Sequence, residues 1–209
     1  MLQIVPGVYA FTGLIMGRVY ALEGADGLTL IDAGIGLAAG KVLKQLQAGG
    51  HRPADVKRIL ITHAHPDHVG GLAQLQAATG AQVMAHALEH PALERQFSHA
   101  RAMPRLCELR AGERLPEVLN GLQIIFTPGH TSGAVCFWQS EQRLLICGDV
   151  LLHLWGLGLP LPFVTADMAE NKRSVKKLAE LEARVVCFGH GQPLLPDAAS
   201  QLRAFAAKL

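Results

Sequence analysis

Short apolar runs, separated by glycine-containing turns and by amphipathic segments, recur from one end of the chain to the other. Short runs rich in valine, isoleucine and leucine predict buried strands, and apolar residues spaced three or four positions apart predict helices. Their alternation indicates an α/β protein. The predicted strands are residues 3–11, 18–23, 28–31, 56–62, 81–86, 122–127, 134–139, 143–147 and 184–188, and the predicted helices are 37–50, 70–79, 167–182 and one that begins at 197.

No Ser/Gly-rich or Pro-rich linker interrupts this alternation, and residues 88–111 are expected to be helical or irregular. A chain of 209 residues is long enough to bury a sizeable core. We therefore expect a single domain over residues 1–209.

Composition narrows the class of protein. Half of the residues are hydrophobic, 17% are charged and the formal net charge is +2, without a dense Lys/Arg run, so no nucleic-acid partner is expected. No uninterrupted apolar stretch is long enough for a membrane helix, and Pro6, Gly7 and Gly13 break the apolar N-terminus, which also lacks a basic start. We expect a cytoplasmic protein with a small-molecule substrate and no membrane partner. Its oligomeric state is left open, with a homodimer as one option.

The four cysteines form no CxxC pair and suit buried, reduced thiols better than a disulfide framework. Arg101 and Arg105 belong to a segment that also carries glutamates, so a solvated face is expected there, with an anion-binding lid as the alternative.

The strongest chemical signal is the segment LITHAHPDHVGG, residues 60–71, which follows an apolar strand. Within it His63, His65, Asp67 and His68 form the pattern HxHxDH. Alternate side chains of an extended segment point the same way, so the first pair can address one metal ion, and a turn after Pro66 lets the second pair address another. Imidazole and carboxylate ligands suit Zn²⁺, Fe²⁺ or Mn²⁺.

Three more candidate ligands stand where apolar strands end. His130 lies in FTPGHTSG, Asp149 in LLICGDV and His190 in VVCFGHG. Ligand sites in α/β proteins form where strand ends converge, so these residues and the HxHxDH segment indicate one cleft.

These motifs, together with LTLIDAG at residues 28–34, resemble the metallo-β-lactamase superfamily over essentially the whole chain. The resemblance implies a four-layer α/β/β/α sandwich and two divalent metal ions, with Zn²⁺ expected first and Fe²⁺ or Mn²⁺ as alternatives. The implied ligands are His63, His65 and His130 for the first metal ion, and Asp67, His68 and His190 for the second, with Asp149 bridging both.

The resemblance also implies a hydrolase in which a hydroxide held by both metal ions attacks a polarised bond. Asp67 and Asp149 are the candidate catalytic residues because a free carboxylate oxygen could orient that hydroxide. Asp32 is expected to hold the HxHxDH segment through hydrogen bonds, although a simple turn former is an equal alternative.

The ligand set is similar to that of glyoxalase II, since zinc β-lactamases usually lack the last histidine of the motif and carry cysteine in place of Asp149. The C-terminal helical extension of glyoxalase II is expected to be missing, because the sequence ends soon after His190. The expected reaction is therefore cleavage of an ester-type bond, such as a thioester or lactone. The alternatives are a mononuclear iron oxidoreductase like the persulfide dioxygenases, a metal-bound regulatory module without turnover, and phosphodiester chemistry.

The segment from Leu151 to Val164 is unusually apolar for a loop. We expect it to cover the metal ions as a lid or wall, with His153, Trp155 and Phe163 as candidate pocket residues. A buried connection and a dimer contact are the alternatives.

Overall fold

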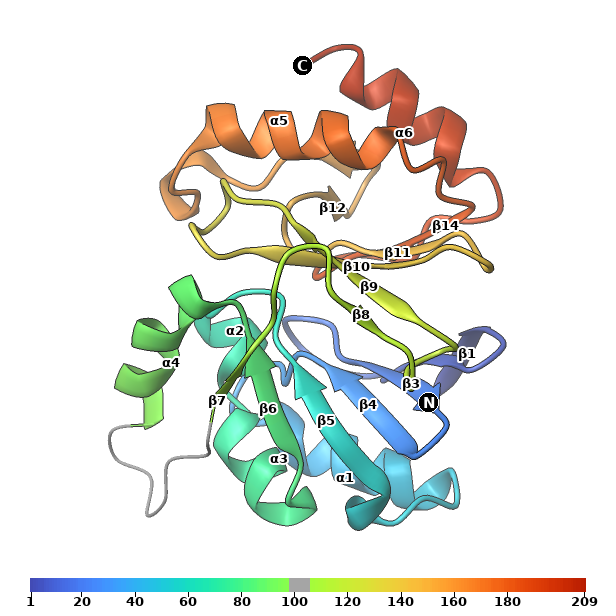
Figure 1. The fold of residues 1–209 in the computed structure, drawn as a ribbon, viewed down its shortest axis with the longest axis vertical. Coiled ribbons are helices and arrows are strands. Elements are labelled where there is room, and N and C mark those ends of the chain that lie inside the picture. The colour runs from blue at the N-terminus through green and yellow to red at the C-terminus, as the bar shows by residue number, and fades with distance from the viewer. Residues whose placement is uncertain (98–105) are drawn as a thin grey trace. The chain divides into compact units, whose positions relative to one another are not determined.

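The computed structural model describes residues 1–97 and 106–209 (Figure 1). The sequence predictions for Arg101 and Arg105 therefore lie outside the described residues. The chain divides into two compact units, one made of residues 1–109 with 115–121 and the other of residues 110–114 with 122–209.

The first unit is built on a seven-stranded sheet whose strands follow one another in chain order. Neighbouring strands are antiparallel from β1 to β4 and parallel from β4 to β7. The strands are β1 (Leu2–Val5), β2 (Val8–Ala10), β3 (Tyr20–Gly24), β4 (Gly27–Ile31), β5 (Val56–Leu60), β6 (Gln82–Ala85) and β7 (Leu106–Glu108). The helices are α1 (Ala38–Ala48), η1 (Pro53–Asp55), α2 (Pro66–Val69), α3 (Leu72–Thr79), η2 (Ala87–Glu89) and α4 (His90–Phe97).

Side-chain alternation explains the core of this unit. Leu28 and Leu30 of β4 share one face of the sheet because side chains two positions apart point the same way. They belong to one buried cluster with Val42 of α1 and Leu72 of α3. The helices therefore cover this face of the sheet with their apolar sides, and burying each large aliphatic side chain contributes roughly 1.5 to 3 kcal/mol.

The second unit is built on a five-stranded sheet in the order β14-β11-β10-β9-β8 and carries a separate two-stranded hairpin. The strands are β8 (Arg114–Leu115), β9 (Leu122–Phe126), β10 (Val135–Gln139), β11 (Leu144–Ile146), β12 (Leu152–His153), β13 (Leu157–Gly158) and β14 (Val185–Cys187). The helices are η3 (Pro162–Val164), α5 (Met168–Ala179) and α6 (Ala198–Ala206), and the two α-helices lie on the same side of the sheet in Figure 1. Trp138, Leu145, Val175 and Leu202 belong to the cluster between these helices and the sheet.

Strand direction brings particular loops to one edge of each sheet. In the second unit β9 and β11 both pair antiparallel with β10, and β11 pairs parallel with β14, so β9, β11 and β14 run in the same direction. In the first unit β4, β5 and β6 are mutually parallel. The loops that follow these strands therefore gather at one edge of their own sheet, and these loops carry the candidate ligands.

The predicted elements occur in the predicted order. The first predicted strand, residues 3–11, is two strands, because Pro6 and Gly7 form a turn between β1 and β2. The short strands β7, β8, β12 and β13 were not predicted. Each unit has its own apolar cluster, and the expected single domain over residues 1–209 stays a prediction. None of the helices in the described part of the chain combines the length and apolar character that crossing a bilayer requires.

Candidate metal centre

The HxHxDH segment leaves the end of β5 in extended form and enters the short helix α2 at Pro66. Proline is suited to the first position of a helix, where its missing N–H group would have no intrahelical partner. His63 and His65 lie on the extended part, with ring centroids 4.7 Å apart, and Asp67 and His68 lie in α2. The His63 and His68 ring centroids are 4.1 Å apart. Three imidazoles are thus gathered within one short segment.

Asp32 anchors this segment from the loop after β4. Its Oδ1 accepts a hydrogen bond from the Thr62 backbone N–H at 2.8 Å, and its Oδ2 accepts from Thr62 Oγ1 at 2.8 Å and lies 2.7 Å from His68 Nδ1. Its backbone φ of 61° lies in the left-handed region, which aspartate tolerates better than most residues. Asp32 therefore acts as a buried connection between two strand ends and is more than a turn former.

These contacts fix the position of the proton on two imidazoles. A carboxylate oxygen only accepts, so His68 Nδ1 donates to Asp32, and in the neutral ring Nε2 carries the lone pair. The single hydroxyl hydrogen of Thr62 is given to Asp32, so Thr62 Oγ1 accepts from His63 Nδ1, which lies 3.1 Å away. In both histidines Nε2 is therefore the nitrogen able to bind a metal ion.

A residue that sequence reasoning missed also holds the segment. Glu89 of η2 is buried, and its Oε2 accepts a hydrogen bond of 2.7 Å from the backbone N–H of Ala64, which stands between His63 and His65. A glutamate after an apolar strand carries no local sequence signal for such a contact. The burial of Glu89, which is seen only in the folded structure, is what indicates its role in holding the segment.

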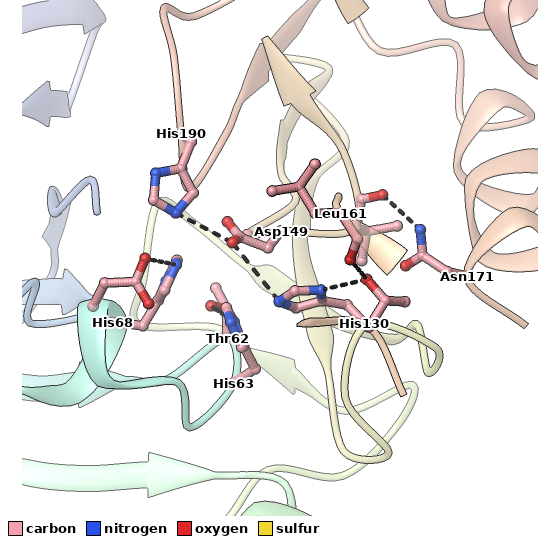
Figure 2. A network of polar contacts seen from close by, with 12 residues as sticks. Thr62, His63, His68, His130, Asp149, Leu161, Asn171 and His190 are labelled. Carbon is pink, nitrogen blue, oxygen red and sulfur yellow. Dashed lines mark hydrogen bonds and ion pairs between the residues drawn. The ribbon is translucent and has the colours of Figure 1, made fainter. Parts of the chain in front are cut away.

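The second unit brings His130, Asp149 and His190 together at one sheet edge. Asp149 Oδ2 lies 3.2 Å from His190 Nε2 and 3.7 Å from His130 Nε2, as the dashed lines of Figure 2 show. The two turns are also joined through the backbone, since Gly189 N–H donates to the Gly148 carbonyl oxygen at 2.8 Å. One carboxylate oxygen therefore faces two imidazoles.

The His130 ring is held in the same way as His63. Thr165 Oγ1 donates its hydrogen to the Leu161 carbonyl oxygen at 2.9 Å, so it accepts from His130 Nδ1, which lies 3.4 Å away (Figure 2). The lone pair of His130 is then on Nε2, which faces Asp149 Oδ2. His130 Nε2 and Asp149 Oδ2 both carry lone pairs and repel each other unless a proton or a cation lies between them.

The apolar segment 151–164 starts beside the turn that carries His190. His153 N–H donates to the His190 carbonyl oxygen at 3.1 Å, and His153 Nδ1 lies 2.8 Å from the Gln192 carbonyl oxygen. A Cβ at Gly191 would lie 1.8 Å from the His153 carbonyl oxygen, so only glycine allows this close approach. Trp155, at the tip of the β12–β13 hairpin, is 99% exposed, and Phe163 is 82% exposed. A buried connection is therefore wrong for these two side chains.

The cysteines of the second unit do not supply thiolate ligands. Burial raises the pKa of the Cys136 thiol to about 12 and raises the pKa of the Cys147 thiol well above its usual range. Cys187 is also buried, whereas Cys107 is partly exposed, and all four are free thiols. The donors at this edge are therefore imidazole and carboxylate.

Two groups of histidine and aspartate side chains in the described part of the chain could hold a metal ion: His63, His65 and His130, and Asp67, His68, Asp149 and His190. The donor set fits a borderline divalent ion. Three of the histidines have their Nδ1 held by an oxygen atom, which leaves Nε2 as the nitrogen for a metal ion, as in histidines that bind metals.

Comparison with models of known families shows to which family this chain belongs. The family model of the metallo-β-lactamase superfamily matches residues 12–190. The chain belongs to the metallo-β-lactamase superfamily. Members of this superfamily bind divalent metal ions, in agreement with the histidine and aspartate groups described above.

Among curated proteins, the chain is 33% identical over 177 residues to a hydroxyacylglutathione hydrolase of Ectopseudomonas mendocina. The matched region is 78% of this chain and 62% of the relative, so the chain spans less than two thirds of that protein. The resemblance to glyoxalase II-type proteins is thus confirmed for the part that they share.

Solved structures confirm the predicted α/β metallo-β-lactamase fold. A metallo-β-lactamase family protein from Thermus thermophilus superposes with a TM-score of 0.79 and 29% identity, over 99% of this chain and 80% of that one. TTHA1623, solved in a di-iron-bound form, superposes with a TM-score of 0.75 and 30% identity, over 93% of this chain and 98% of that one.

Proposed function

We propose that this chain is a metal-dependent hydrolase that uses two divalent metal ions. His63, His65 and His130 would hold the first metal ion, and Asp67, His68 and His190 the second, with Asp149 as the bridging ligand. This assignment follows the two groups of candidate ligands, which are His63, His65 and His130, and Asp67, His68, Asp149 and His190.

The observation that carries the proposal is the pairing of acceptor atoms within each unit. His130 Nε2 and Asp149 Oδ2 face each other at 3.7 Å, and His68 Nε2 and Asp67 Oδ2 at 4.0 Å. In the neutral rings each Nε2 carries a lone pair, because Nδ1 donates elsewhere. Facing acceptors repel unless a positive charge lies between them, and a divalent cation would supply it.

When bound, two divalent ions would lower the pKa of a shared water molecule and polarise the bond to be cleaved. Asp67 and Asp149 are the proposed catalytic residues, because a carboxylate oxygen can accept a hydrogen bond from an attacking water molecule and orient it. Asp32 and Glu89 hold the ligand-bearing backbone through hydrogen bonds.

The proposed substrate is a small molecule with an ester-type bond, such as a thioester or lactone. The names of the curated relatives, hydroxyacylglutathione hydrolases, support an acyl substrate. His153 lies against the His190 turn, and the exposed rings of Trp155 and Phe163 follow in the same segment. These three residues are proposed to contact an apolar part of the substrate.

Zinc is the first proposed metal because imidazole and carboxylate donors suit it. The di-iron form of TTHA1623 makes iron the main alternative, since the same donors accept both ions. A cytoplasmic location, the absence of nucleic-acid and membrane partners, and the oligomeric state stay predictions.

A hydrolysis panel of thioesters, lactones and phosphodiesters, run on protein of measured metal content, tests the proposal. Asp67→Asn should lower the kcat of the best substrate about 100-fold or more, because an amide orients water poorly. The matched control is Asp197→Asn at the exposed start of α6, which should leave kcat unchanged. One iron per chain with oxygen consumption, or full activity of the Asp67→Asn variant, would contradict the proposal.

A further inference from the structure

We propose that Asn171 is a positioning residue that fixes Asp149 and His130 relative to each other. This inference rests on the proposed function, in which Asp149 bridges two metal ions and His130 binds one of them. Asn171 lies in α5 and contacts neither metal ion in this scheme.

The first observation is a buried hydrogen bond to the turn that carries Asp149. Asn171 is fully buried, and its Nδ2 donates to the carbonyl oxygen of Val150 at 3.0 Å. A dashed line at Asn171 marks this hydrogen bond in Figure 2. Val150 directly follows Asp149 along the chain. The amide therefore holds the backbone that aims the Asp149 carboxylate.

The second observation is the contact between the same residue and the turn that carries His130. A Cβ at Gly129 would lie 2.2 Å from the Asn171 backbone nitrogen and 2.7 Å from its Cβ. Gly129 has a φ of 132°, a conformation that residues with a side chain rarely adopt. The turn before His130 is thus pressed directly against Asn171.

Neighbouring residues of α5 hold the His130 turn as well. The Asp167 backbone N–H donates to the Gly129 carbonyl oxygen at 2.8 Å, and Ser174 Oγ donates to the Pro128 carbonyl oxygen at 2.7 Å. Among the described contacts of these three residues, the link to the Asp149 turn belongs to Asn171. Asn171 therefore joins the two turns, whereas Ser174 serves one of them.

The position of Asn171 on the helix supports a specific role. The buried residues of α5 follow one another at helical spacing: Asn171, Ser174, Val175, Leu178 and Ala179. A polar side chain on such a face costs free energy unless it is hydrogen-bonded. Asn171 Oδ1 has no hydrogen-bond partner among the described residues, so the hydrogen bond from Nδ2 to Val150 is the one that this side-chain amide makes there. Asn171→Leu therefore removes this one hydrogen bond and keeps the number and branching of the side-chain heavy atoms.

The test is a titration of the metal-free protein with Co²⁺ in competition with a chelator, followed by the visible absorption of bound cobalt. Asn171→Leu should weaken cobalt binding about 10- to 100-fold, the range seen when residues that support metal ligands are lost. Ser174→Ala is the matched comparison from the same helix: it removes the hydrogen bond to the Pro128 carbonyl oxygen alone, leaves the Asp149 turn held by Asn171, and should weaken cobalt binding less than Asn171→Leu does. Asn171→Ser is the second variant, because it places no apolar group against the Val150 carbonyl oxygen.

The unfolding temperature of each metal-free variant separates positioning from stability. Equal destabilisation by Asn171→Ser and Ser174→Ala, with the larger loss of cobalt affinity in Asn171→Ser, supports the positioning role. Wild-type cobalt affinity and an unchanged cobalt spectrum in both Asn171 variants would overturn it. If the wild-type chain itself bound no metal ion, the proposed function would fail, which is a separate and distinguishable result.

Discussion

Two buried carboxylates hold the ligand-bearing segment of the first unit, one from each side. Asp32 binds Thr62 and His68, and Glu89 binds the backbone of Ala64. Both side chains are almost fully buried. Burying a carboxylate costs free energy unless its oxygens are hydrogen-bonded. The hydrogen bonds from the ligand-bearing segment therefore stabilise the buried Asp32 and Glu89 carboxylates, and the same hydrogen bonds hold the segment in place.

Glu89 gives a prediction at this scale. Glu89→Leu leaves the Ala64 N–H without its acceptor, which should lower the free energy of unfolding by about 1 to 3 kcal/mol and weaken metal binding about tenfold or more. Glu89→Gln keeps a carbonyl oxygen at this position and should retain most of both properties. Denaturant unfolding of the metal-free protein and chelator competition measure the two effects. Equal losses in both variants would show that the charge, not the acceptor, is what matters.

Single residues also mark the limit of sequence-based prediction. The HxHxDH pattern and the glycine-flanked His130, Asp149 and His190 carry local signals, because the ligand type and the preceding strand are visible together. Asn171 carries a weaker signal and Glu89 carries none, since their partners lie far away in the sequence. An asparagine on the apolar face of a predicted helix was the available hint, and Glu89 offered none.

The secondary-structure elements deliver the ligands by one simple rule. Parallel strands end at the same edge, and each candidate ligand of the second unit follows β9, β11 or β14. The long strands and the amphipathic helices were predictable from their periodicity. The two- and three-residue strands β7, β8, β12 and β13 were not, because such short segments have no measurable alternation and form through their neighbours.

The β12–β13 hairpin gives the prediction at this scale. Because Trp155 is 99% exposed, Trp155→Ala should change the stability of the fold little, by about 0.5 kcal/mol at most. If the ring contacts substrate, the same change should raise KM for long-chain esters and spare short-chain ones. Leu37→Ala, which removes an apolar side chain that is 79% exposed on the first unit, is the matched control.

The KM values across an ester chain-length series, measured for both variants, decide this point. An unchanged chain-length profile would contradict the pocket role of Trp155. A shift from dimer to monomer in sedimentation would then assign the hairpin to a contact between copies of the chain.

At the scale of the whole molecule, both units carry candidate ligands. The first carries His63, His65, Asp67 and His68, and the second carries His130, Asp149 and His190. The fold and the family were predictable from these residues because their combined pattern is specific, and the family match over residues 12–190 agrees. The substrate was not predictable, because the loops that select it differ among proteins that share a fold.

The most direct test of the central claim is the metal content of the purified chain, measured by elemental analysis after removal of loosely bound ions. We expect two divalent ions per chain in the unaltered protein, and a clear loss when His68→Ala or Asp149→Ala removes a proposed ligand of the second site. Zinc or iron at that stoichiometry fits the account. A chain that retains no divalent ion, or the same metal content in all three proteins, would contradict it.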